Sequence, residues 1–175
     1  MNNLTRIGIV IGRFQPLHLG HMNIIKTMIE ENDKVIILIG RDQHDDDLFD
    51  YDERKEMVEQ IFNKEINDSI LKIFPISDIG LNDNKYWYFY VLGIIINHIC
   101  FNDIITFYIG DDIDYFNLDI LKLNKIKIGL RIIHRKETKL AGTHIRKLIK
   151  NKKWEKLTNL VDDIIFNYII MKYDK

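Results

Sequence analysis

The residues best suited to chemistry lie in one ten-residue segment, Gly12-Arg-Phe-Gln-Pro-Leu-His-Leu-Gly-His21. The segment follows an apolar run of strand length and opens a run with helical spacing, so we expect it to join a strand to a helix. His18 and His21 are three residues apart, which lets them converge near the first helical turn and donate hydrogen bonds to phosphate oxygens. Arg13 adds a permanent positive charge, and Gly20 would let the helix start, with its free N–H groups, approach a phosphate. The segment therefore predicts a phosphate-binding turn.

Other roles of the histidines have to be weighed. Either His18 or His21 alone is as readily a structural residue at a helix start, and a two-histidine zinc site lacks further ligands at supporting spacing. The dinucleotide fingerprint G-x-G-x-x-G and the Walker loop are both absent from the sequence. Residues 43–47, Gln-His-Asp-Asp-Asp, are of metal-ligating types, but an acidic run is more often a mobile, solvated loop. We therefore place no metal site there.

Apolar runs rich in β-branched residues alternate with segments of helical spacing along the chain. We expect strands at residues 7–11, 35–39, 71–74, 104–109 and 126–133. We expect helices at residues 19–31, 52–66, 85–99, 114–123, 143–150 and 153–172.

This alternation predicts an α/β fold, a Rossmann-like, doubly wound, parallel five-stranded sheet of order 3-2-1-4-5 with helices on both faces and a C-terminal helical extension. We interpret the chain as one domain, with a core over about residues 1–140 and C-terminal helices over about residues 141–175. Ligands of such sheets bind at the carboxyl ends of the strands, which is where residues 12–21 would lie.

Composition narrows the possible partners. The 175 residues contain 25 basic and 26 acidic side chains, a balance that does not favour binding to nucleic acid or to a membrane surface. The longest apolar stretch, residues 91–109, is interrupted by polar side chains, so we expect no membrane span. Cys100 is the only cysteine and has apolar neighbours, so we expect a buried thiol and a cytoplasmic protein.

The motif H-x-G-H after the first strand resembles that of the nucleotidyltransferase superfamily. The longer segment G-R-F-Q-P-L-H-L-G-H is similar to the archaeal-type nicotinamide mononucleotide adenylyltransferases and their bacterial and phage relatives. The resemblance implies transfer of AMP from ATP to the phosphate of nicotinamide mononucleotide, giving NAD and pyrophosphate. It implies catalytic roles for His18, His21 and Arg146. The ATP-binding residues that it implies are Gly12, Arg13, Phe14, Gln15, Gly20, Arg54, Gly110, Thr143 and Arg146.

Later segments carry the same resemblance. Residues 142–146 are similar to the family's S-G-T-x-I-R, although Ala141 stands in place of the serine, and we expect Thr143 to cap a helix there. Residues 52–54 resemble the family's G-E-R. Asp78, Asn84 and Trp87 resemble the family's P-x-x-D-I and N-x-x-W, which implies that they hold the nicotinamide mononucleotide, with two extra residues between the two parts.

The resemblance further implies ATP and nicotinamide mononucleotide as substrates, Mg²⁺ bound through the ATP phosphates, and a homo-oligomer. Two alternatives remain open. One is an adenylyltransferase or cytidylyltransferase for another acceptor, such as phosphopantetheine or glycerol phosphate. The other is a nucleotide-sensing module without turnover.

Overall fold

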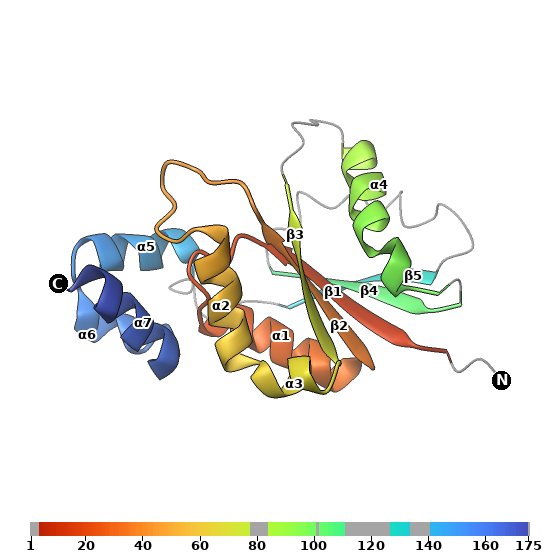
Figure 1. Ribbon diagram of the computed structural model, residues 1–175, viewed down its shortest axis with the longest axis horizontal. Coiled ribbons are helices and arrows are strands. Elements are labelled where there is room, and N and C mark those ends of the chain that lie inside the picture. Colours follow the sequence, from red (N-terminus) through yellow and green to blue (C-terminus); the bar gives the residue numbers. More distant parts are fainter. Residues whose placement is uncertain (1–3, 78–83, 101, 111–126, 134–140, 175) are drawn as a thin grey trace.

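The computed structural model describes residues 4–77, 84–100, 102–110, 127–133 and 141–174 (Figure 1). Its strands are β1 (Arg6–Gly12), β2 (Lys34–Gly40), β3 (Leu71–Ile76), β4 (Ile104–Ile109) and β5 (Lys127–Ile132). Its α-helices are α1 (Leu19–Glu31), α2 (Tyr51–Ile61), α3 (Asn63–Asn67), α4 (Asn84–Ile95), α5 (Gly142–Lys150), α6 (Trp154–Leu157) and α7 (Asp163–Tyr173), and a 3₁₀ helix, η1 (Ile96–His98), follows α4.

The five strands form one parallel sheet of order β3-β2-β1-β4-β5, which confirms the predicted topology. The central strand β1 pairs with β2 on one side and β4 on the other, so that Ile9 lies between Ile36 and Phe107. The strand order reverses at β1, and the carboxyl ends of β1 and β4 therefore flank the position where such sheets bind ligands.

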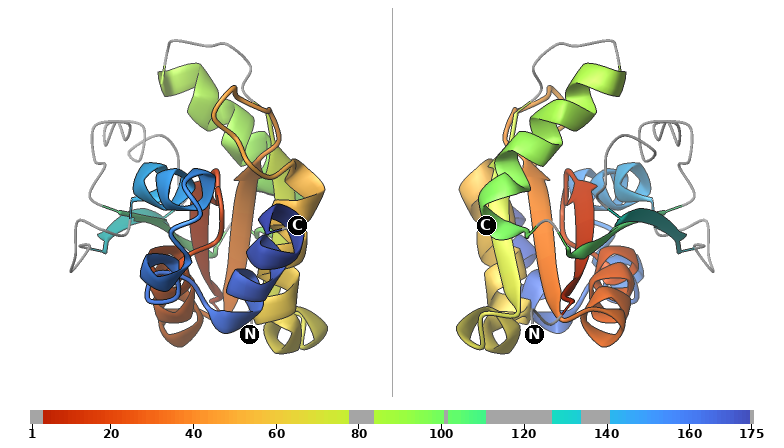
Figure 2. Two further views of the ribbon diagram at one scale, coloured as in Figure 1. Left: turned by 90° about the vertical axis from the view of Figure 1, so that its left-hand side faces the viewer. Right: turned by 90° about the vertical axis from the view of Figure 1, so that its right-hand side faces the viewer.

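Helices cover both faces of the sheet, because successive side chains of a strand point to opposite sides. On one face, Val10 and Ile37 pack in a core with Met28 of α1 and Met57 of α2. On the other face, residues of β1 and β2 pack in a second core with α4. That second core includes Ile7, Ile9, Ile36, Leu38, Val91 and Ile95. Figure 2 shows α1 and α4 on opposite sides of the sheet.

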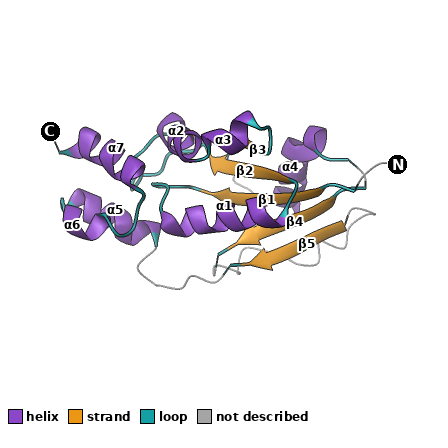
Figure 3. Cartoon of the chain, turned by 90° about the horizontal axis from the view of Figure 1, so that it is seen from below, coloured by secondary structure: helices purple, strands orange, loops and turns teal. Residues whose placement is uncertain are grey.

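The C-terminal helices α5, α6 and α7 lie beyond the carboxyl ends of the strands (Figure 3). They join the core on the α1 side through residues such as Ile149, Leu157 and Ile165. Within the part of the chain that the structure describes, no helix has the length and apolar character needed to cross a membrane.

Two expected helices are each divided. The predicted helix 52–66 breaks at Phe62, which ends α2 and begins α3. The predicted helix 153–172 is split into α6 and α7, because Leu160 and Val161 are buried between them and the Asp162 side chain caps α7 by accepting from Ile164 N at 3.0 Å. The expected helix at 114–123 lies outside the described residues.

The prediction for Cys100 was wrong, because its thiol is exposed. The residue lies between η1 and β4, where its backbone N–H donates to Asp103 Oδ2 at 2.6 Å. Cys100 is therefore not a core residue, although its neighbours in the sequence are apolar.

Candidate functional site

His18 is the N-cap of α1 and is buried. Its Nδ1 accepts hydrogen bonds from Gly20 N at 3.1 Å and His21 N at 3.4 Å, and Leu19 N donates to Leu160 O at 3.0 Å. The first three N–H groups of α1 are thus already partnered, which differs from the expectation of free donors for a phosphate. Because Nδ1 is an acceptor, the neutral His18 ring carries its proton on Nε2 and can donate from that atom.

His21 lies in the first turn of α1 and stacks on His18, with ring centroids 3.7 Å apart and planes inclined by 24°. The centroid of its ring also lies 4.7 Å from that of the buried Phe14 ring. Phe14 has φ of 50°, a left-handed conformation that is rare outside glycine, and such strained residues cluster at functional sites. Gly12 is also constrained, since a Cβ there would lie 3.1 Å from the Phe14 ring. The turn therefore holds both imidazoles in one arrangement.

Gln15 is 2% exposed, and its side chain connects the turn after β1 to the loop before α2. Its Oε1 accepts from Leu48 N at 3.2 Å and Phe49 N at 3.0 Å, and its Nε2 donates to Phe49 O. Both polar atoms of the amide are thereby engaged by backbone, so in this structure Gln15 positions a loop. The ATP contact implied by the resemblance stays a prediction.

Arg54, in the first turn of α2, is 1% exposed. Its Nη1 donates to Arg13 O at 2.7 Å and its Nε to Asp50 O at 2.9 Å, while Nη2 is buried without a hydrogen-bond partner among the described residues. Burial lowers the pKa of this guanidinium, and the negative charge of Asp47 opposes that shift. Arg54 thus braces the backbone of the turn that carries the histidines.

Arg146 brings α5 to the same turn, although the two segments are far apart in the sequence (Figure 1). Its Nη1 donates to Gln15 O at 3.1 Å, and its Nη2 donates to Asp46 Oδ2 at 2.5 Å and to Thr143 Oγ1 at 3.4 Å. Gly142 leaves room for this guanidinium, because a Cβ there would lie 3.2 Å from Arg146 Nη1 and would require it to shift. Thr143 was expected to cap the helix, but the N-cap is Ala141 and Thr143 is the second helical residue.

Two acidic residues complete the cluster. Arg13 Nη2 donates to Asp46 Oδ1 at 2.8 Å and to Asp47 Oδ1, and Asp46 also accepts from Arg146. The hydrogen bond from Arg13, reinforced by Arg146, lowers the pKa of Asp46 to about 2. The interpretation of residues 43–47 as a mobile, solvated loop misses these contacts. The site expected from the sequence contains three arginines, and their positive charge could have indicated that carboxylates would lie nearby to balance it.

Of the three residues expected at the nicotinamide end, the structure describes the side chain of Trp87 alone. Trp87 lies on α4, on the other face of the sheet, and packs half-buried against the second core. Tyr90, one turn further along, accepts a hydrogen bond from Ser77 N at 3.2 Å and so joins α4 to the end of β3. Asp78 and the side chain of Asn84 lie outside what the structure describes. Gly110 directly follows β4, beside β1, at the edge where the cluster lies.

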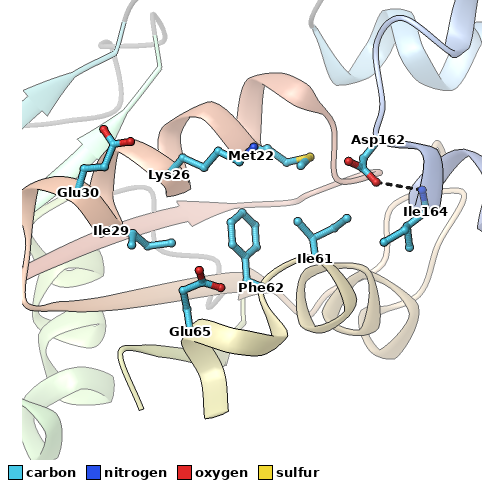
Figure 4. Close-up of a pocket in the computed structure, with 9 residues that line it drawn as sticks. All are labelled: Met22, Lys26, Ile29, Glu30, Ile61, Phe62, Glu65, Asp162 and Ile164. Carbon is cyan, nitrogen blue, oxygen red and sulfur yellow. Dashed lines mark hydrogen bonds between the residues drawn. The ribbon is translucent and has the colours of Figure 1, made fainter. Parts of the chain in front are cut away.

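Metal-ligating side chains do not gather here. Across the described ranges, no group of three or more His, Cys, Asp or Glu residues is arranged to hold a metal ion. Asp46 and Asp47 are engaged by arginines instead. A groove between α1, the α2–α3 junction and the start of α7 lies apart from the cluster, lined by residues such as Ile29, Phe62 and Ile164 (Figure 4).

A family model described as cytidylyltransferase-like matches residues 9–172, which include every element of this cluster. The chain belongs to the cytidylyltransferase-like family. The nicotinamide-nucleotide adenylyltransferase of Thermoplasma acidophilum is 32% identical over 155 residues, which cover 83% of this chain and 76% of that relative. These matches confirm the family that the motifs indicated.

Other relatives of this cytidylyltransferase-like chain match over shorter stretches. The nicotinamide-nucleotide adenylyltransferase of Saccharolobus solfataricus is 39% identical over 88 residues, 48% of this chain and 50% of the relative. A phosphopantetheine adenylyltransferase of Desulfotalea psychrophila is 39% identical over 74 residues, 42% of this chain and 44% of the relative. The chain thus spans about half the length of these two relatives.

A solved structure supports the fold. The bifunctional NMN adenylyltransferase/ADP ribose pyrophosphatase of Francisella tularensis superposes with a TM-score of 0.75 at 21% identity. The superposition covers 98% of this chain and 51% of that chain.

Proposed function

We propose that this chain is a nicotinamide-nucleotide adenylyltransferase, which forms NAD and pyrophosphate from ATP and nicotinamide mononucleotide. The observation that carries the proposal is the hydrogen bond from Arg146 to Gln15 O, because it brings two motif segments together at the carboxyl end of β1. The names of the archaeal relatives support the choice of acceptor.

The reaction needs no nucleophile from the protein. An oxygen of the mononucleotide phosphate attacks the α-phosphorus of ATP, a new P–O bond forms, and the bond to the β-phosphate oxygen breaks to release pyrophosphate. The acceptor phosphate is already ionised at neutral pH, so catalysis consists of alignment and of neutralising negative charge. Bringing two anions together is the main obstacle.

Side chains of the cluster suit this task. Arg13 and Arg146 provide charged donors to the triphosphate, and His18 and His21 donate from rings whose positions are fixed by capping and stacking. Arg54 holds the backbone of Arg13 in place. Donors that are positioned before the reaction need no reorganisation when charge develops in the transition state.

Mg²⁺ would enter as part of the substrate, Mg-ATP, and neutralise phosphate charge in that form. The donor set of the described residues fits this assignment, since its carboxylates are paired with arginines rather than grouped to hold a resident ion. Homo-oligomerisation and a cytoplasmic location stay predictions.

The proposal is tested by supplying the purified chain with Mg-ATP and nicotinamide mononucleotide and measuring NAD and pyrophosphate. Arg146→Ala should reduce kcat by about 10²-fold to 10³-fold, as expected for loss of one transition-state donor. Arg131→Ala is the matched control, because Arg131 lies on β5 and is half-exposed, paired with Glu31. Absence of NAD formation by the folded wild-type chain would contradict the proposal.

A second acceptor has support from a specific finding. The phosphopantetheine adenylyltransferase relative matches at the same identity as the Saccharolobus enzyme, 39%, although over fewer residues. Phosphopantetheine offered in the same assay separates the two, because each product has its own mass.

A further inference from the structure

Five charged side chains meet where the triphosphate of ATP is proposed to bind. Three of them are arginines, Arg13, Arg54 and Arg146, and two are carboxylates, Asp46 and Asp47. Arg146 belongs to α5, Arg54 to α2 and Arg13 to the turn after β1, whereas both carboxylates come from one loop between β2 and α2. The carboxylates therefore reach arginines that other elements hold in place.

The two carboxylates differ in their surroundings. The Asp47 side chain is fully buried, pairs with Arg13 and accepts a hydrogen bond from His44 N at 3.1 Å. The Asp46 side chain is 49% exposed, and its two oxygens are divided between Arg13 at 2.8 Å and Arg146 at 2.5 Å. Asp47 is thus enclosed by its own loop, and Asp46 lies at the surface of the cluster.

The loop is held in this position from two sides. Gln15 binds the backbone of Leu48 and Phe49 from the turn after β1. From α7, Tyr173 Oη donates to Leu48 O at 2.5 Å and Lys172 Nζ donates to the same oxygen at 3.1 Å. Phe49 itself is buried in the core. The backbone of Leu48, two residues after Asp46, is therefore fixed, and this holds the Asp46 side chain beside the arginines.

Carboxylate and phosphate oxygens compete for the same guanidinium donors, because both form short, charge-assisted hydrogen bonds with arginine. A triphosphate that binds Arg13 and Arg146 through their Nη2 groups has to take those donors from Asp46. It need not displace Asp47, which is buried beside Arg13 and near Arg54.

We propose that Asp46 is a displaceable internal counterion, which pairs with Arg13 and Arg146 until the triphosphate of ATP replaces it, and that Asp47 is a permanent one. This proposal rests on the proposed function for the position of the triphosphate. Asp46 lowers the affinity for every anion, since binding must first break its two ion pairs. A triphosphate carries more negative charge than a monophosphate, so an Asp46 carboxylate that stays in place repels it more strongly.

The test is titration calorimetry of ATP, inorganic triphosphate and AMP with the wild-type chain and Asp46→Asn. Two partly exposed ion pairs are individually weak, so removing them should tighten triphosphate and ATP binding by about threefold to tenfold. ATP and triphosphate should gain more affinity than AMP does, because they carry more negative charge. Asp46→Ala should behave as Asp46→Asn does, which excludes an effect of the new amide.

Asp45→Asn is the matched control. It removes the same charge from the same loop, but Asp45 is exposed and forms no ion pair within the described ranges. It should change ATP affinity by less than about twofold, as screened surface charges do. Asp47→Asn should instead lower the melting temperature, because it removes a buried negative charge that offsets the charge of the buried Arg54.

Unchanged or weaker triphosphate binding by folded Asp46→Asn would overturn the proposal, and so would equal tightening in Asp45→Asn. The proposed function is judged separately by NAD formation. If Asp46→Asn binds triphosphate more tightly and no NAD is formed, the counterion stands and the acceptor assignment fails. If NAD is formed and the affinity for triphosphate does not rise, the acceptor assignment stands and the counterion proposal fails.

Discussion

Replacing Gln15 with alanine removes the side chain that joins the turn after β1 to the loop before α2. Three backbone groups lose their partner: Leu48 N, Phe49 N and Phe49 O. The two groups of Phe49 are buried, and the Leu48 group is partly buried. The carbonyl of Gln15 still accepts from Arg146, so the change is confined to the loop side.

The size of the effect follows from these contacts. A buried backbone group without a partner costs about 1–3 kcal/mol, and water that enters the vacated space offsets part of this cost. We expect Gln15→Ala to lower the free energy of unfolding by about 2–4 kcal/mol. In a protein of this size that is a fall of roughly 5–15 °C in melting temperature. The KM for ATP should rise too, because the released loop leads into α2, whose Arg54 holds the backbone of Arg13.

Thermal unfolding followed by circular dichroism measures the melting temperature, and steady-state kinetics measure the KM for ATP. Gln43→Ala is the control, since it replaces the same residue type at an exposed position of the same loop. If Gln15→Ala melts at the same temperature as the control while its KM for ATP rises, Gln15 contacts the nucleotide directly. That result would contradict its role in holding the loop.

Three further predictions follow from the site. His21→Ala should lower kcat by at least about 10²-fold. His44→Ala, at an exposed loop position, should leave kcat unchanged. Equal activity of the two variants would show that His21 has no catalytic role. Trp87→Ala should weaken binding of nicotinamide mononucleotide in calorimetry and spare ATP binding, and the opposite pattern would exclude the stacking role. In the folded chain the pKa of Asp46 is lowered from 3.8 to about 2. Ionised Asp46 therefore stabilises the fold at a pH above its pKa in the unfolded chain, and this stabilisation is lost as the pH falls through its pKa in the folded chain. In urea unfolding, the difference in stability between wild type and Asp46→Asn should therefore vanish towards pH 2, and a constant difference would contradict the ion pairs.

The strands and their order were predictable because parallel strands buried on both faces are continuous apolar runs, as in Ile7–Ile11 and Val35–Ile39. The position of the turn that is expected to bind phosphate followed from the same fold, because it lies after the first strand. The breaks at Phe62 and at 158–162 were not predictable from helical spacing, because apolar residues continue across both.

The destinations of individual side chains were harder to predict. Gln15 and Arg54 bind backbone carbonyls and amides that only the folded chain brings near them. Asp46 and Asp47 were interpreted as solvated because composition describes a loop in isolation, whereas in the fold they pair with two arginines from other segments, Arg13 and Arg146. The roles of the site residues in binding and catalysis stay predictions.

A competition experiment among phosphate acceptors tests adenylyl transfer to nicotinamide mononucleotide. The purified chain receives Mg-ATP with equal concentrations of nicotinamide mononucleotide, nicotinic acid mononucleotide, phosphopantetheine and glycerol phosphate, and the products are identified by mass spectrometry. We expect a dinucleotide made from a pyridine mononucleotide to dominate, and Arg146→Ala to form it about 10²-fold to 10³-fold more slowly. Dominance of dephospho-coenzyme A or of a glycerol product would contradict this expectation.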